Sequence, residues 1–286
     1  MTVGTGNPPS ESALFWSAIS KSFVYSLLVC LGVIVLYPLL WMAASGFKTN
    51  TQIFNAPFAM PLSWSLENYI GAWNEGVRSF LVSSLIVTAT SAFCTVMISA
   101  WTAYGLTRTR MPGKPLITAF ILGGLMLSPT VALIPLVRMM QSVGLYNTHW
   151  ALILLYTAFR IPFTTFLIRA YMLELPSDLD EAARMDGASE GQIFWRIMLP
   201  LCRPIIVSSV ILHILFAWNE YLFAMIFTNA QEVQTLPVGL TSLMAKHGTD
   251  YAQVFAAMTI SALPIVLLFF AMQRYFVRGL TEGIGK

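Results

Sequence analysis

Two ionisable residues, Arg160 and Glu220, lie inside long apolar stretches of this sequence. An isolated Arg inside a membrane span costs at least about 2.5 to 3.5 kcal/mol unless it is paired or hydrated. Counting from the ends of the two stretches, at about 1.5 Å per helical residue, places both residues near the middle of a bilayer. We therefore expect the two side chains to face the interior of a helical bundle and to approach each other, directly or through water. The pair would either line a pathway or lock two helices together.

Glu220 has neighbours that could bind a solute: His213, Trp218, Asn219 and Tyr221. Sugars are held by hydrogen bonds and by flat aromatic faces packed against their C–H surfaces, so this mixture is chemically suited to a carbohydrate. The same residue types are typical of a polar contact between helices with interfacial aromatics. His213 taken alone is more often a buried histidine with a hydrogen-bond partner than a ligand or a proton relay.

Catalytic and cofactor motifs are not found in the sequence. His149, His213 and His247 are too dispersed to suggest a metal or catalytic set, and the three cysteines have no CxxC spacing. No GxxxxGK[ST] loop is present to cradle a phosphate. We expect neither a catalytic site nor a cofactor in this chain, and its formal charge of +3 requires no nucleic acid partner.

The composition predicts that these residues are positioned by membrane-spanning helices. The chain is 57% hydrophobic and 10% charged, which is too little polar surface to cover a soluble protein. A bilayer core of about 30 Å requires roughly 20 helical residues per span, and lipid cannot satisfy the backbone of an open sheet. The sequence therefore predicts an all-α, polytopic protein. Its six expected spans lie near residues 23–44, 80–104, 116–137, 150–171, 205–228 and 254–276.

The distribution of Lys and Arg predicts how the spans are oriented. If both termini are cytoplasmic, only four basic residues fall outside the cell: Lys48, Arg78, Arg138 and Lys246. We expect a cytoplasmic segment 1–22, a six-helix transmembrane domain 23–276 and a cytoplasmic tail 277–286. The first stretch is too long for a signal peptide. Several helix breakers predict bent helices: Pro38, Gly123, Gly124, Pro129, Pro135, Pro162 and Pro264.

The loop 172–203 is charged and helix-forming, in contrast to the apolar sequence around it. We expect Ser177 to cap a short helix with an apolar stripe, and Gly187 to end that helix with a positive φ. The stripe consists of Leu179, Ala182 and Ala183. We expect Ser189 to cap a second helix and Pro200 to end it. The sequence thus predicts a compact helix–turn–helix outside the bilayer, which another protein could contact.

The residues Glu181-Ala182-Ala183, Gly187 and Ile197-x-Leu199-Pro200 resemble the EAA signature of permease subunits in ATP-binding-cassette (ABC) importers. Other segments are similar to the maltose-type, carbohydrate-importing branch of that family. They are residues 47–49, 67–69, 173–187, 219, 236–240 and 273–283. The resemblance therefore extends over nearly the whole chain.

The resemblance implies a mechanical role. In this family the EAA loop forms a coupling helix that docks in a cleft of a separate ATPase subunit. The resemblance implies that the docking contacts with the ATPase are made by Glu181, Ala182, Ala183 and Gly187. The residues that would hold the shape of the loop are Asp186, Ile197, Leu199 and Pro200. The tail from Arg278 resembles one that reaches between the ATPases; its candidate contacts are Arg278, Gly279 and Glu282.

The implied partners are a second, larger permease in a heterodimer, two ATPase subunits that bind ATP and Mg²⁺, and an extracytoplasmic solute-binding protein. The implied location is the plasma membrane of a bacterium or an archaeon. In the maltose-type arrangement the larger permease supplies most sugar contacts.

Two other functions remain open at this point. The same machinery could carry a polyol or glycerol phosphate, and an anionic phosphate would favour an Arg160 without a carboxylate partner. A proton-coupled secondary transporter could use Glu220 and His213.

Overall fold

The computed structural model describes residues 11–246 and 250–282, with side chains described for residues 21–245 and 250–272. These ranges contain helices and connecting segments and no strand. The helices are α1 Glu11–Ser45, α2 Asn50–Asn55, α3 Glu67–Ala72, α4 Arg78–Arg108, α5 Lys114–Met126, α6 Leu133–Ser142, α7 His149–Glu174, α8 Asp178–Met185, α9 Glu190–Ile193, α10 Leu199–Leu201, α11 Arg203–Asn219, α12 Leu222–Phe227, α13 Leu236–Lys246 and α14 Tyr251–Glu282.

Four helical stretches within the described residues are long and apolar enough to cross a membrane: Lys21–Ser45, Glu67–Arg108, His149–Glu174 and Tyr251–Met272. Two further stretches are bent pairs. Lys114–Met126 and Pro129–Ser142 meet at 87°, and Glu190–Leu201 and Arg203–Asn219 meet at 76°. The described chain thus has four continuous candidate spans, or six if each bent pair crosses as one.

Two predicted spans are not straight helices. The stretch 116–137 breaks after Met126, because Pro129 opens a short 3₁₀ turn, Pro129–Ala132, before α6. The stretch 205–228 breaks at Glu220 and Tyr221, which separate α11 from α12. In contrast, Pro38, Pro162 and Pro264 lie inside helices that continue through them.

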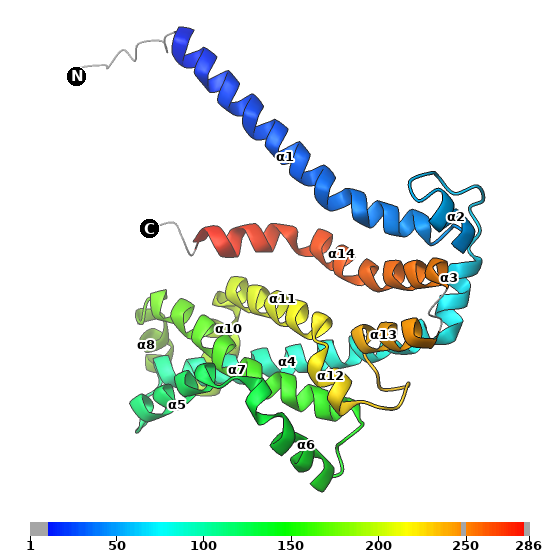
Figure 1. The fold of residues 1–286 in the computed structure, drawn as a ribbon. Coiled ribbons are helices and arrows are strands. Elements are labelled where there is room, and N and C mark those ends of the chain that lie inside the picture. The colour runs from blue at the N-terminus through cyan, green and yellow to red at the C-terminus, as the bar shows by residue number, and fades with distance from the viewer. Residues whose placement is uncertain (1–10, 247–249, 283–286) are drawn as a thin grey trace.

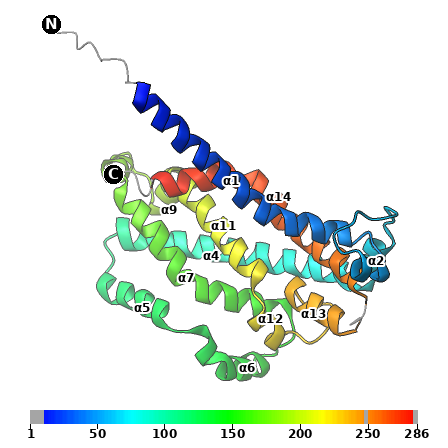
Figure 2. The ribbon, with the colours of Figure 1, turned by 45° about the horizontal axis from the view of Figure 1, so that its top comes forward.

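α4 and α7 form the central pair of the bundle, and α11 packs across both (Figures 1 and 2). Close packing is possible because the buried side of α4 is rich in small residues, such as Ser91, Ala92 and Ala100. Leu152 and Tyr156 of α7 are fully buried in a cluster that also contains residues of α12. This pair extends from the α8 end of the molecule to the α13 end (Figure 1).

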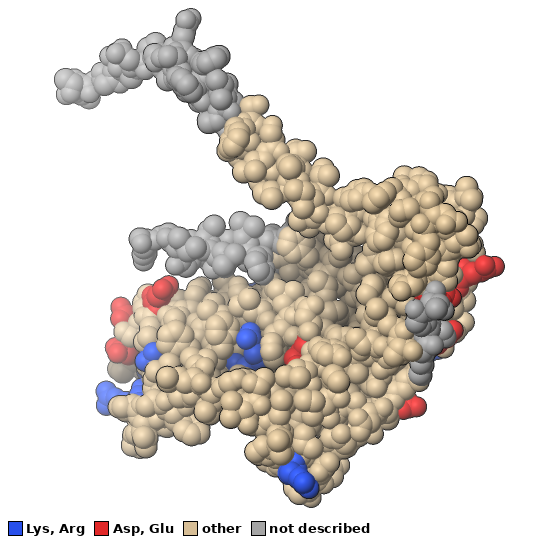
Figure 3. Space-filling view, viewed as in Figure 1, with Lys and Arg blue, Asp and Glu red and all other residues tan. Residues whose placement is uncertain are grey.

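α1 diverges from the rest of the bundle (Figures 1 and 2). Its side chains from residue 21 to 40 are exposed except at Gly32, and Trp41 near its end stacks edge-on against Phe255 of α14 at 5.1 Å. A helix that is apolar all round must be covered by lipid or by another protein. In Figure 3 charged atoms lie mostly toward the edges of the face shown, and a small group of blue and red atoms lies near its middle on an otherwise uncharged surface.

Candidate functional site

The segment between α7 and α11 folds as two short helices joined by a tight turn at one end of the bundle (Figure 1). α8 ends at Met185, and Gly187 follows with a φ of 81°, as the sequence predicts. Ser189 caps α9 through a capping box with Gln192, which is also as predicted.

Ser177 does not cap α8 as predicted: its backbone is helical and its side chain makes no capping hydrogen bond. The first turn of α8 contains three acidic residues, Asp178, Asp180 and Glu181, whose negative charge the helix dipole favours. This charge compensates the N-terminus without a side-chain cap.

Pro200 does not end the second helix as predicted. The chain stays helical to Leu201 and bends at Cys202. A π-helical turn, Phe194–Met198, interrupts the i→i−4 bonding just before α10, and this accommodates a residue without an N–H.

An apolar cluster anchors the two short helices on the bundle. It joins Ala183 of α8 and Ile193, Phe194 and Met198 of the following helix to the ends of α4 and α7 nearest α8. The α4 and α7 members are Ala100, Ala103, Tyr104, Ile168 and Met172. Ile197 and Leu199 are half-buried and pack against this cluster, whereas Pro200 is exposed.

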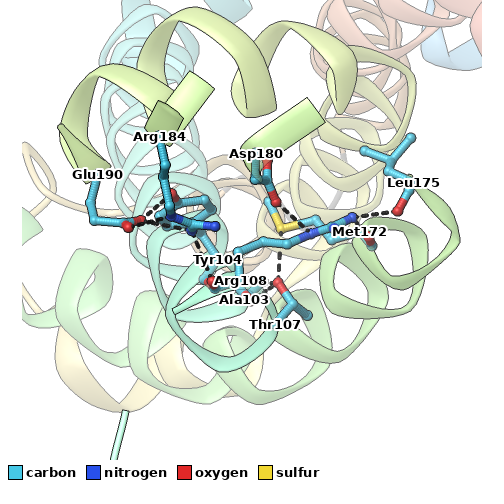
Figure 4. Close-up of polar contacts among 9 residues, drawn as sticks. All are labelled: Ala103, Tyr104, Thr107, Arg108, Met172, Leu175, Asp180, Arg184 and Glu190. Atoms are coloured by element: carbon cyan, nitrogen blue, oxygen red, sulfur yellow. Dashed lines mark hydrogen bonds and ion pairs between the residues drawn. The ribbon is translucent and has the colours of Figure 1, made fainter. Parts of the chain in front are cut away.

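Arg108, in the last turn of α4, joins three elements (Figure 4). Its Nη2 donates to the main-chain oxygens of Met172 (2.5 Å) and Leu175 (2.6 Å), at the end of α7. Its Nε lies 3.3 Å from Oδ2 of Asp180 in α8, and the two side chains are only 9% and 2% exposed. Burial raises the pKa of the Asp180 carboxyl, and the charge of Arg108 opposes that rise. Arg108 therefore neutralises a buried acid and caps the last carbonyls of α7.

Arg184 forms a second link between α8 and its surroundings (Figure 4). Its Nε donates to Oε1 of Glu190 at 2.8 Å, and its Nη2 donates to the main-chain oxygen of Arg108 at 3.0 Å. The hydroxyl of Tyr104 donates to Oε2 of Glu190 at 2.6 Å. The hydrogen bond with Glu190 raises the pKa of the Arg184 guanidinium, so the pair stays ionised. Both polar links from α8 thus converge on the last turn of α4.

The part of α8 that does not pack on the bundle is accessible. Glu181, Ala182, Asp186 and Gly187 are exposed, and Met185 beside them is 88% exposed. The predicted apolar stripe is divided between the two sides, because Ala183 is buried while Leu179 and Ala182 are exposed. A cavity of about 770 Å³ lies between α8 and the end of α4 and is lined by acidic and basic side chains, among them Asp180, Glu181 and Arg184.

Arg160 and Glu220 form no direct ion pair, and their predicted approach through water stays a prediction. The Glu220 carboxylate accepts hydrogen bonds from the Tyr156 hydroxyl (2.7 Å) and from the backbone N–H groups of Phe223 (2.9 Å) and Ala224 (3.1 Å). It therefore caps α12 at the break after α11. The Arg160 guanidinium lies instead over two phenyl rings, those of Phe163 and Phe216.

The other pathway candidates are not gathered at one open site. His213 is fully buried, and its Nε2 lies 2.9 Å from Oγ of Ser91. Trp218 is buried with residues of α3, α13 and α14. Asn219 and Tyr221 are exposed at the break. The tail candidates Arg278, Gly279 and Glu282 belong to α14, but their side chains lie outside the described residues. The helix continues past residue 276, at which the last span was predicted to end.

The residues that fix α8 were not predicted from the sequence: Tyr104, Arg108, Arg184 and Glu190. In the sequence, Arg108 is only one of the basic residues that are expected on the cytoplasmic side. The available signal was its place at the end of a long apolar helix, where free carbonyls attract a cation.

Comparisons with known proteins agree with this geometry. Residues 95–282 match the family described as "Binding-protein-dependent transport system inner membrane component". The chain is 47% identical over 268 residues to the "Probable ABC transporter permease protein YurM" of Bacillus subtilis, covering 94% of this chain and 89% of the relative. It is 34% identical over 263 residues to the "Trehalose/maltose transport system permease protein MalG" of Thermococcus litoralis, covering 90% of this chain and 94% of the relative.

The fold is also similar to that of a solved protein. A chain in the crystal structure of a bacterial ABC transporter involved in the import of the acidic polysaccharide alginate superposes with a TM-score of 0.79 and 21% identity. The match covers 95% of this chain and 100% of that chain. This protein therefore belongs to the inner-membrane components of binding-protein-dependent transport systems, as a multi-pass permease of the plasma membrane.

Proposed function

We propose that this chain is one of two permease subunits of an ATP-driven carbohydrate importer, and that an ATPase subunit docks on the exposed side of α8. One observation carries the proposal. α8 is accessible at Glu181, Ala182 and Met185 on one side, and it is tied to α4 and α7 by buried contacts on the other. A short helix fixed in this way transmits a displacement to the bundle instead of absorbing it.

In this mechanism the chain supplies the lever and separate subunits hydrolyse ATP. When the docked ATPases close, α8 moves with them. The contacts of Arg108 with Asp180 and with the last carbonyls of α7 carry that movement into two long helices at once. Because α4 and α7 extend to the far end of the molecule, a displacement at α8 changes the opening between the two permeases there.

The assembly we propose has α8 on the cytoplasmic side, in agreement with the excess of basic residues at that end. ATP and Mg²⁺ are bound by two ATPase subunits, a second permease completes the pathway, and a solute-binding protein docks at the opposite end. The names of similar proteins support a carbohydrate solute, since one belongs to a trehalose/maltose system and another to an importer of alginate.

Co-expression with the neighbouring transport genes tests the proposal. We expect the chain to co-purify with a second permease and ATPases, and a solute-loaded binding protein to stimulate ATP hydrolysis. Glu181→Lys should abolish stimulated hydrolysis and uptake, because it places a positive charge in the docking surface. Glu174→Lys is the matched control, since Glu174 is exposed at the end of α7 and outside that surface. Normal uptake by the Glu181→Lys importer would refute the docking role.

A further inference from the structure

Arg160 is a cation for which the described chain provides no counter-charge. The guanidinium carbon lies 4.8 Å from the ring centroid of Phe163 and 4.9 Å from that of Phe216. Its Nε is buried without a hydrogen-bond partner, and no carboxylate among the described side chains lies within ion-pair distance of it. Aromatic faces attract the cation but leave its N–H groups free to bind an anion.

Glu220 cannot easily become that partner. Its carboxylate already accepts three hydrogen bonds, two of them from backbone N–H groups at the start of α12. Turning it toward Arg160 would leave those two groups without an acceptor, which is costly in a buried position. An anion that pairs with Arg160 would therefore come from outside the described chain.

The location of Arg160 excludes lipid as its surroundings. It lies on α7 roughly 16 Å from one helix end and 21 Å from the other at 1.5 Å per residue, too far for its side chain to reach either membrane surface. An Arg at that depth faces a water-filled pathway or the bundle interior. Arg160 is half-buried and Phe163 is 38% exposed, so the group is partly open at the surface of this subunit.

The aromatic rings around the cation indicate the class of anion. The Phe216 ring also contacts the rings of Tyr156 and His213, with centroids 5.7 and 6.2 Å apart. Flat apolar faces beside a planar fork of N–H donors match a sugar ring bearing an anionic oxygen group. We propose that Arg160, Phe163 and Phe216 form a subsite for an anionic sugar, a uronate or a sugar phosphate, on its way through the importer. This inference rests on the function proposed above and specifies its solute class.

The first test compares solutes in the complete importer, reconstituted in proteoliposomes with its binding protein. A neutral disaccharide, the matching uronate disaccharide and a hexose phosphate are supplied at equal concentration. We expect uptake of an anionic member, and we expect Arg160→Gln to reduce that uptake at least tenfold. Arg138→Gln is the matched control, because Arg138 is an exposed Arg on α6 outside the subsite. Arg160→Lys should retain uptake of a phosphate better than uptake of a uronate, which needs the planar fork.

The second test measures whether position 160 faces water. Arg160→Cys is made in a background in which Cys30, Cys94 and Cys202 are replaced by alanine, and a membrane-impermeant thiol reagent is applied to the assembled importer. Labelling is expected. Lack of labelling would overturn the inference, and so would an importer that carries only neutral sugars.

Loss of permease pairing in the Arg160→Gln variant would also overturn the inference, since the anion would then belong to the partner subunit. In each of these cases the wild-type importer would still couple ATP hydrolysis through α8. They are therefore distinguishable from failure of the proposed function, in which no ATPase docks.

Discussion

Asp180 and Glu181 are adjacent acids in the first turn of α8, yet their environments are opposite. Asp180 is buried against Arg108, whereas Glu181 is exposed. A buried charge is tolerated only when it is paired, so Asp180 belongs to the framework that holds α8. An exposed acid costs little to keep and remains available to a partner, so Glu181 can contribute to the docking surface that we propose.

Gly187 provides a prediction at the level of one residue. Its φ of 81° is the left-handed region that residues with a Cβ disfavour, and a Cβ added at this position would meet no atom within 4 Å. Gly187→Ala should therefore lower the free energy of unfolding by about 1 to 2 kcal/mol through the backbone alone. The measurement is unfolding of the purified subunit by SDS in mixed micelles.

Gly191→Ala is the control for that substitution. Gly191 also has open space around its Cβ position but lies inside α9 without a positive φ. This variant should be neutral or slightly more stable, because alanine favours helix. Equal losses in the two variants would show that the left-handed turn is not what limits stability.

At the level of elements, the two short helices differ in how their N-termini are capped. α9 has a complete capping box formed by Ser189 and Gln192, whereas α8 has acidic residues and no side-chain cap. Ser189→Ala should therefore lower the free energy of unfolding by about 1 kcal/mol. Ser177→Ala should have no measurable effect. The same SDS titration checks both, and a larger loss for Ser177→Ala would contradict the assignment.

The features that local rules determine could be predicted from the sequence. The spacing of Ser189 and Gln192 is enough to specify a cap, and Gly187 after an amphipathic turn is enough to specify a left-handed residue. The EAA-like residues also identified the loop that contains α8, part of whose surface is exposed. These inferences succeed because they depend on a few neighbouring residues.

The features that depend on three-dimensional packing could not be predicted in this way. Charge alone suggested Glu220 as the partner of Arg160. The helix break at residues 220–221 instead leaves two backbone N–H groups without helical partners, and both donate hydrogen bonds to the Glu220 carboxylate. Neither Gly nor Pro marks that break. The role of Arg108 was hidden for the same reason, since its acceptors are carbonyls of a helix that begins 41 positions later in the chain.

At the scale of the whole molecule, α4 and α7 connect the two ends of the bundle, and Arg108 connects both helices to α8. Arg108→Met alone should destabilise the subunit by about 3 to 5 kcal/mol, because it leaves Asp180 buried and unpaired. The double variant Arg108→Met/Asp180→Leu should recover most of that loss, since it replaces a buried ion pair with apolar residues of similar volume and gives up only the hydrogen bonds to the last carbonyls of α7.

The double variant separates stability from coupling. If Arg108 transmits movement, the variant importer should assemble and hydrolyse ATP while transporting several-fold less solute per ATP. The measurement is the ratio of uptake to hydrolysis in proteoliposomes. Arg110→Met is the control, because Arg110 is exposed two residues beyond Arg108. An unchanged ratio in the double variant would show that the apolar cluster around Phe194 transmits the movement instead.

The exposed side of α8 is, in this mechanism, the surface that an ATPase grips. Replacing Met185, which is 88% exposed, by a photo-crosslinking amino acid tests this contact in the assembled importer. Illumination should produce one covalent adduct, containing this chain and an ATPase subunit, whereas the same amino acid at the exposed position Leu173 should produce none. An importer that transports solute normally but forms no ATPase adduct from position 185 would contradict the account.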